Sequence, residues 1–195
     1  VDKNGQLVKE IQSGYTIKND LNNIEQRDFI RDYMQKLWDD CYNAVYYKKD
    51  RKGNAISDVK EFISQKIDIQ SLVDTYLLNE IVCDPDLYLT SFFMNIDFAN
   101  NKKLTFEAPW DFDSTMGLKK HEPNEQGLFA SVVGYDVNYE RVGFANPWMV
   151  IFSNEDWFNQ MVKEKWNSIK DTLFTEVTNQ IDVLTNQYAD CFIAN

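Results

Sequence analysis

Histidine is almost absent from this sequence, and its scarcity excludes several kinds of active site. His121 is the only histidine, so a zinc site built from several histidines cannot form. A Ser-His-Asp triad would have to use His121, which stands in polar sequence, and the chain has no Gly-x-Ser-x-Gly motif. We therefore interpret His121 as a solvated loop residue.

Cysteine is scarce as well. The chain has three, Cys41, Cys83 and Cys191, which are far apart and odd in number. They lack the close pairing that zinc sites and redox dithiols use. We interpret them as small apolar core residues rather than as a disulfide framework.

Positive charge and long hydrophobic runs are also lacking. The 20 lysines and arginines face 31 acidic residues, so the net charge is −11. Such a charge repels phosphate backbones and anionic lipid surfaces. No apolar stretch approaches the roughly 18 residues of a membrane-spanning helix. We therefore predict neither a nucleic-acid partner nor a membrane span.

The composition is otherwise that of a folded protein, with 44% hydrophobic and 14% aromatic residues, and we expect one domain over residues 1–195. Apolar residues at steps of three and four predict a long helix from Asn23 that ends before Arg51. A short helix capped by Ser57 follows. The next helix is capped by Asp68 and ends at Asp84-Pro85, because proline disfavours a helical predecessor.

The second half of the chain is less regular. Residues 118–149 contain three glycines and two prolines without periodicity, which indicates a long irregular segment. A helix capped by Ser153 follows, with Phe158 on its buried side. A last helix is expected to bury a stripe that includes Val177, Ile181 and Leu184.

Between Tyr88 and Ala108 the hydrophobic period changes to two. Alternate residues of 92–98 share one face, alternate residues of 104–108 share another, and 99–102 form the turn. This pattern predicts a β-hairpin. The predicted fold class is thus α+β, predominantly helical, with one central hairpin.

Four aspartates flank this hairpin, and its geometry should bring them together. With the turn centred near Asn100 and Asn101, Ser91 is expected roughly opposite Trp110, and adjacent strands lie about 4.8 Å apart. The carboxylates expected at this end belong to Asp84, Asp86, Asp111 and Asp113. These carboxylates would repel one another unless they were protonated or neutralised by a divalent cation. Mg²⁺ is a suitable cation, because it binds a few carboxylates together with water and phosphate oxygens. Asp111 and Asp113 could face one ion if their segment is extended. The alternative is that the aspartates cap turns and helix starts.

The sequence around these aspartates resembles the hallmark stretch of the CotH (spore coat protein H) kinase-like family. The matching segments are Leu78-Asn79-Glu80, Asp84-Pro85-Asp86, Ser91-Phe92-Phe93, Ala108 through Asp113, Gly117, and the later Asn146-Pro147-Trp148. The resemblance implies the C-terminal lobe of an atypical protein kinase-like fold. We expect the N-terminal nucleotide lobe to be absent or truncated, because no glycine-rich phosphate loop precedes the match.

The resemblance also implies roles for individual residues. Asp86 would be the catalytic-loop aspartate that accepts a proton from the acceptor hydroxyl, and Asp111 the catalytic metal aspartate, with Asp113 as a second metal ligand or its support. Ser91 stands five residues after Asp86, where kinases place a cofactor-binding asparagine. Lys119 is a candidate phosphate contact because it follows the aspartates closely.

The implied function is Mg-ATP-dependent phosphoryl transfer to serine or threonine hydroxyls of a protein, such as a coat or cell-surface protein, outside the cell or on a spore. A second hypothesis is a non-catalytic surface or assembly module on the same scaffold, which Ser91 and the missing nucleotide lobe favour. A third is a glycosyltransferase-like site in which Asp111-x-Asp113 binds a nucleotide sugar. That site would need a parallel α/β sheet before the motif, where the sequence predicts helices.

Overall fold

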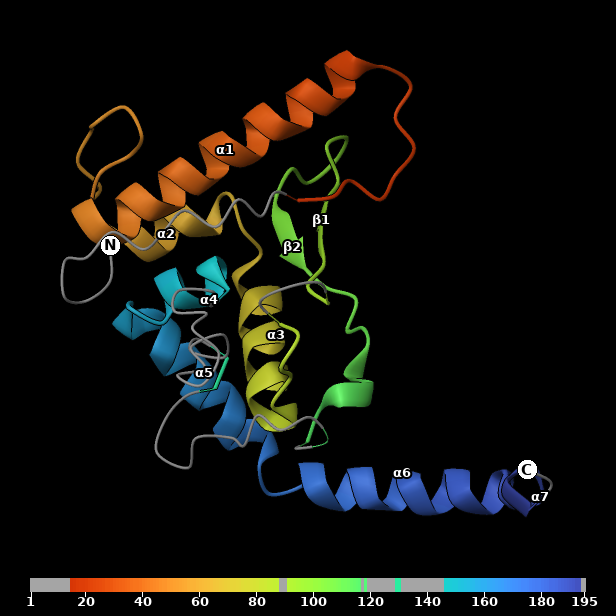
Figure 1. The fold of residues 1–195 in the computed structure, drawn as a ribbon. Coiled ribbons are helices and arrows are strands. Elements are labelled where there is room, and N and C mark those ends of the chain that lie inside the picture. The colour runs from red at the N-terminus through yellow and green to blue at the C-terminus, as the bar shows by residue number, and fades with distance from the viewer. Residues whose placement is uncertain (1–14, 88–90, 117, 119–128, 131–145, 194–195) are drawn as a thin grey trace, which may run out of the picture.

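A computed structural model describes residues 15–87, 91–116, 118, 129–130 and 146–193 (Figure 1). The elements are α1 (Ile24–Tyr47), α2 (Val59–Ser64), α3 (Ile69–Val82), β1 (Met94–Ile96), β2 (Leu104–Phe106), the 3-10 helix η1 (Phe112–Ser114), α4 (Pro147–Phe152), α5 (Asp156–Ile169), α6 (Leu173–Gln187) and α7 (Ala189–Ile193). The described residues are rich in helix and contain one antiparallel hairpin, which agrees with the predicted α+β class. None of the helices in the described residues is long and apolar enough to cross a membrane.

The first three helices follow the predicted pattern, with one boundary error. Asn23 caps α1 by accepting from the Gln26 amide at 2.9 Å, and Asp68 caps α3. The predicted cap Ser57 is wrong, because α2 begins one residue later. The extended Asp58 accepts from the backbone N–H of Glu61 at 2.9 Å instead. Both residue types are good caps, so spacing alone does not choose between neighbours.

The start of α4 corrects two further predictions. The irregular segment predicted through residue 149 is wrong over its last residues, because Pro147 opens α4. Proline fits the first helical turn, where its missing N–H would have no helical partner. Asn146 caps α4 by accepting from the Trp148 amide at 3.0 Å. Ser153 lies at the C-terminal end of α4, and α5 follows Glu155, so the predicted Ser153 cap is also wrong.

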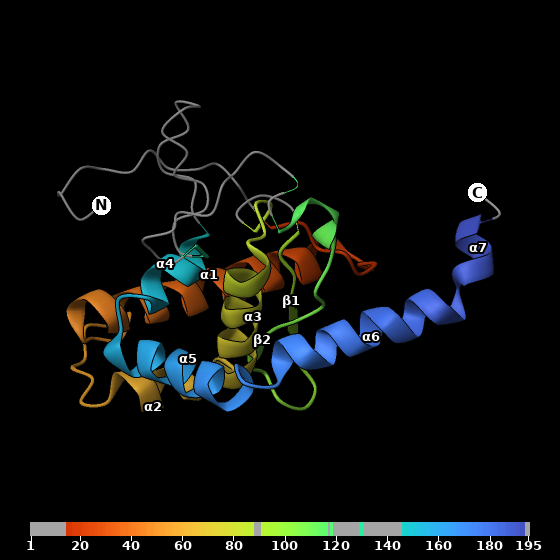
Figure 2. The ribbon, with the colours of Figure 1, turned by 90° about the horizontal axis from the view of Figure 1, so that it is seen from below.

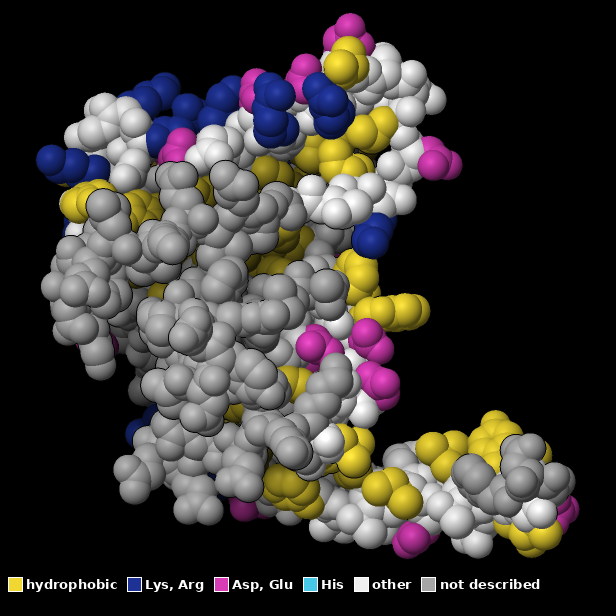
Figure 3. Space-filling view, in the orientation of Figure 1, with side chains coloured by type: hydrophobic (Ala, Val, Ile, Leu, Met, Phe, Trp, Pro, Cys, Tyr) yellow, Lys and Arg dark blue, Asp and Glu magenta, His cyan; other side chains and the backbone are white. Residues whose placement is uncertain are grey.

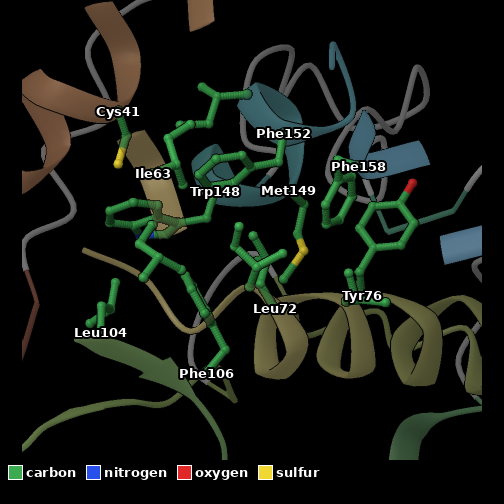
Figure 4. Close-up of a cluster of buried hydrophobic side chains, with 14 of the residues drawn as sticks. Cys41, Ile63, Leu72, Tyr76, Leu104, Phe106, Trp148, Met149, Phe152 and Phe158 are labelled. Carbon is green, nitrogen blue, oxygen red and sulfur yellow. The ribbon is translucent and has the colours of Figure 1, made fainter. Parts of the chain in front are cut away.

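The core lies where α4 and α5 meet α3 and the hairpin (Figure 4). Trp148 is fully buried and packs edge-to-face on Trp38 of α1 and Phe106 of β2, with ring centroids 5.1 and 5.7 Å apart. Phe158 of α5 packs edge-to-face on Tyr76 of α3 at 5.2 Å. Aromatic pairs therefore join helices from both halves of the chain to the hairpin.

The hairpin is fastened to α3 through its second strand. Met94 pairs with Phe106 and Ile96 with Leu104, which confirms the predicted hairpin. The turn lies at residues 98–101, one residue earlier than the predicted 99–102. The Phe106 amide donates to Ser71 Oγ at 3.0 Å, and Thr75 Oγ1 donates to the Phe106 carbonyl at 3.2 Å. Since both hydroxyls belong to α3, this helix determines where the base of the hairpin lies.

Helix α6 corrects the prediction of a second buried stripe near the C-terminus. It extends away from the rest of the described structure, as two orthogonal views show (Figures 1 and 2). None of its residues is buried, and Ile181 is 56% exposed. The sequence marks an apolar face at Val177, Ile181 and Leu184, but no described element covers it.

The three cysteines have different surroundings. Cys41 is buried in the core as predicted, Cys83 is half-buried and Cys191 is exposed, so the core interpretation is wrong for Cys191. All three are free thiols. Burial raises the pKa of the Cys41 thiol to about 12, with a smaller contribution from the neighbouring Asp40 carboxylate.

This difference predicts selective alkylation. The thiolate is the reactive form, so at about pH 8 iodoacetamide should modify Cys191 in the folded protein and leave Cys41 unmodified. Mass spectrometry of digests before and after unfolding in guanidinium measures both sites. Modification of Cys41 at the Cys191 rate in the folded state would contradict the buried position. Cys191→Ser provides the control, because it should remove the rapid modification of the folded protein at Cys191 and leave the protection of Cys41 unchanged.

Candidate functional site

The chain segments on either side of the hairpin meet near the C-terminal end of α3. The Met116 amide donates to the carbonyl of Val82, the last residue of α3, at 2.7 Å. Ser91 Oγ donates a long hydrogen bond of 3.4 Å to Asp111 Oδ2. Figure 3 shows acidic side chains gathered on this side of the molecule, beside a protruding hydrophobic one. The predicted approach of the segment before the hairpin to the segment after it is therefore present.

Asp84 and Asp86 form a tight turn after α3. The α3 helix ends in a left-handed residue, Cys83, and Asp84 Oδ1 then accepts from the Asp86 amide at 2.9 Å. Asp84 is fully buried, whereas Asp86 is half-buried. Asp84 thus organises the turn, as the turn-capping alternative predicted, and its turn fixes the backbone that carries Asp86.

Asp111 and Asp113 lie on the surface, in a turned segment. Asp111 has left-handed backbone angles (φ 66°, ψ 44°), and Phe112–Ser114 form the 3-10 helix η1. The extended conformation that would align the two carboxylates by alternation is therefore absent. Ala108 is also left-handed, with φ 62°. Non-glycine residues in this region cost about 1 kcal/mol or more each, and such strain collects at functional sites.

The described side chains at this site limit how many protein ligands a metal ion could have. No group of three or more His, Cys, Asp or Glu side chains in the described residues could hold a metal ion. The four predicted carboxylates thus do not form one cage in this part of the chain. Mg²⁺, however, is usually held by one or two carboxylates together with water and substrate phosphates. Asp111 and Asp113 are exposed and could supply them. Lys119 and Gly117 lie outside the described residues.

A family model described as CotH kinase protein matches residues 4–192, which is nearly the whole chain. The chain belongs to the CotH kinase family. No curated protein and no solved structure matches it. The resemblance found from the aspartate motifs is thus confirmed. The CotH family suggests an atypical kinase-like domain and, in general, the use of a nucleotide and a metal ion.

Two polar residues of the CotH-like segment Leu78-Asn79-Glu80 have structural partners that the sequence did not reveal. The Glu80 carboxylate accepts from the amides of Phe129 at 2.7 Å and Ala130 at 3.0 Å. Asn79 is buried and bonds to the Thr75 carbonyl of its own helix. The motif was visible in the sequence, but helical spacing gives no sign of partners 50 residues away.

Proposed function

We propose that this CotH-family chain is the C-terminal lobe of an atypical protein kinase-like domain, which transfers phosphate from Mg-ATP to serine or threonine hydroxyls of a protein. The observation that carries the proposal is the Ser91–Asp111 hydrogen bond of 3.4 Å, which joins the segment after Asp86 to the exposed aspartate pair. A catalytic loop and a metal aspartate must meet in this way for phosphoryl transfer, which depends on positioning and charge neutralisation.

Each residue has a role that follows from its position. Asp86, on the turn fixed by Asp84, accepts the proton of the acceptor hydroxyl. Asp111 and Asp113 hold the metal, and the buried Ser91 hydroxyl orients the Asp111 carboxylate. Bound Mg²⁺ would neutralise phosphate charge. Lys119 contacts a phosphate in this proposal.

The second candidate is a non-catalytic surface or assembly module on the same scaffold. It is favoured by Ser91, which stands where kinases place an asparagine and is a shorter, weaker ligand. In either case we propose a location outside the cell or on a spore or cell surface, with a coat or surface protein as partner.

Titration calorimetry with ATP and ADP, with and without Mg²⁺, separates these candidates. The chain should bind nucleotide in the presence of Mg²⁺, and Asp111→Ala should weaken this binding at least about tenfold, since a ligating carboxylate is lost. Asp171→Ala is the matched control, because Asp171 is an exposed aspartate in the connection between α5 and α6. Absence of binding by the unmodified chain, or equal effects of the two variants, would favour the non-catalytic module.

A further inference from the structure

The two strands of the hairpin separate at its base. Beyond the Met94–Phe106 pair, the Glu107 amide reaches the Phe93 carbonyl only at 3.4 Å, and Ala108 then turns left-handed. The segments approach again at the Ser91–Asp111 hydrogen bond, also 3.4 Å. Two long hydrogen bonds therefore enclose an opening in the strand pairing.

A small pocket of about 20 Å³ lies in this opening. Its wall from α3 consists of Thr75, Leu78 and Asn79. The hairpin side includes Ser91, Phe93 and Trp110. A volume of this size holds about one water molecule, provided that polar partners are present.

The α3 wall supplies an acceptor that lacks a donor. Asn79 is only 5% exposed, and its Nδ2 donates to the Thr75 carbonyl at 2.8 Å. Its Oδ1 is buried and has no hydrogen-bond partner within the described part of the chain. A buried acceptor without a donor is destabilising and is usually satisfied by protein or by ordered water.

The two hydroxyls that line the pocket in the described residues cannot serve as that donor, because each has a single proton that is already used. Thr75 Oγ1 donates to the Phe106 carbonyl, and Ser91 Oγ donates to Asp111 Oδ2. Each hydroxyl oxygen can still accept. An occupant that brings its own protons would satisfy the Asn79 oxygen, and a water molecule has two.

We propose that this pocket binds one ordered water, which donates to Asn79 Oδ1 and to Ser91 Oγ. Through this water, Asn79 becomes a positioning residue for Asp111. Because Ser91 Oγ accepts a hydrogen bond from the water, the Ser91 hydroxyl proton stays directed at the Asp111 carboxylate. The water site stands on the pocket and the orphaned Asn79 oxygen alone, whereas the positioning role rests on the proposed metal function of Asp111.

A crystal structure of the chain that shows ordered waters tests the site directly. We expect a water about 2.7–3.2 Å from both Asn79 Oδ1 and Ser91 Oγ. An empty pocket, or an Asn79 oxygen that accepts from a protein donor, would overturn the site. This result does not depend on any nucleotide binding.

The positioning role is tested by Mg²⁺-dependent ADP binding in Asn79→Leu, Ser91→Ala and the double variant. Each single change should weaken it about tenfold, as removal of outer partners of metal ligands does, and the double variant should be no weaker than either. Binding of ADP without Mg²⁺ should not change. Asp171→Ala, in the connection between α5 and α6 and outside the pocket lining, should have no effect.

Additive losses, or unchanged Mg²⁺-dependent binding in folded Asn79→Leu, would overturn the positioning role. Circular dichroism checks the fold, and Asn79→Ala, which also removes the acceptor oxygen, provides a second route to the same result if Asn79→Leu is unstable. If the unmodified chain binds no nucleotide, the proposed function fails and the positioning role fails with it, whereas the crystallographic water still decides the site.

Discussion

Replacement of Trp148 with alanine is expected to lower the free energy of unfolding by about 3–5 kcal/mol. Trp148 is among the largest fully buried side chains in the described core and lies at its centre (Figure 4). It packs on Trp38, Phe106 and Phe152, and its indole Nε1 donates to the Tyr15 hydroxyl at 2.7 Å. Truncation removes these contacts and leaves a cavity where α4 meets α1 and β2.

Trp110→Ala provides the matched control, because it is the same substitution at a tryptophan that is 61% exposed. Trp110 keeps only an edge contact with the Phe93 ring among the described aromatic pairs, at 6.3 Å. Its replacement should change stability by about 0.5 kcal/mol or less. Denaturant unfolding of both variants measures the difference. Similar midpoints for Trp148→Ala and Trp110→Ala would contradict the central position of Trp148.

The second large effect is expected at Asp40, a buried carboxylate of α1. It lies 3.2 Å from Lys66 Nζ and 3.4 Å from Arg51 Nε, and it accepts from the Arg51 amide at 3.1 Å. Asp40→Ala leaves these donors without their acceptor. Breaking a buried ion pair costs about 3–5 kcal/mol. The Lys66 and Arg51 side chains are 29% and 38% exposed, so water can solvate them when Asp40 is removed. We therefore expect Asp40→Ala to lower the free energy of unfolding by about 2–3 kcal/mol.

Asp74→Ala serves as the control for Asp40→Ala. Asp74 pairs with Lys165 at 2.9 Å between α3 and α5, but both side chains are open to water. Such surface pairs contribute about 0–1 kcal/mol. Thermal unfolding at low and moderate salt should therefore show a large loss for Asp40→Ala and a small, salt-sensitive loss for Asp74→Ala. Equally small losses for the two variants would contradict a large contribution of the Asp40 ion pairs to stability.

The sequence predicts elements well where one physical signal dominates. The long apolar period of α1, the Asp68 cap and the alternation of the hairpin each gave the observed element. Boundaries were less certain where several capping residues stand together, as at Ser57 and Asp58. The α6 helix was recognised, but its burial was not, because an apolar stripe shows which face is hydrophobic and does not identify what packs on it.

For the candidate site, chain order predicted more than side-chain geometry. Hairpin pairing correctly placed Ser91 beside the residues that follow β2, and the motif order led to the family. The left-handed backbone conformations of Ala108 and Asp111 were not predictable, because neither residue is glycine, the residue type that most often indicates a positive φ. The buried state of Asn79 also lies beyond pattern reasoning, since asparagine is usually exposed.

The left-handed conformations of Ala108 and Asp111 indicate how the backbone between these two residues is held in place. Neither residue prefers this backbone state by itself, so the conformation is imposed from outside, by the Glu107–Phe93 bond before it and by the Met116–Val82 bond after it. A synthetic peptide that copies residues 104–116 would lose both anchors and relax to ordinary backbone angles. The aspartate pair therefore belongs to the folded chain rather than to its local motif.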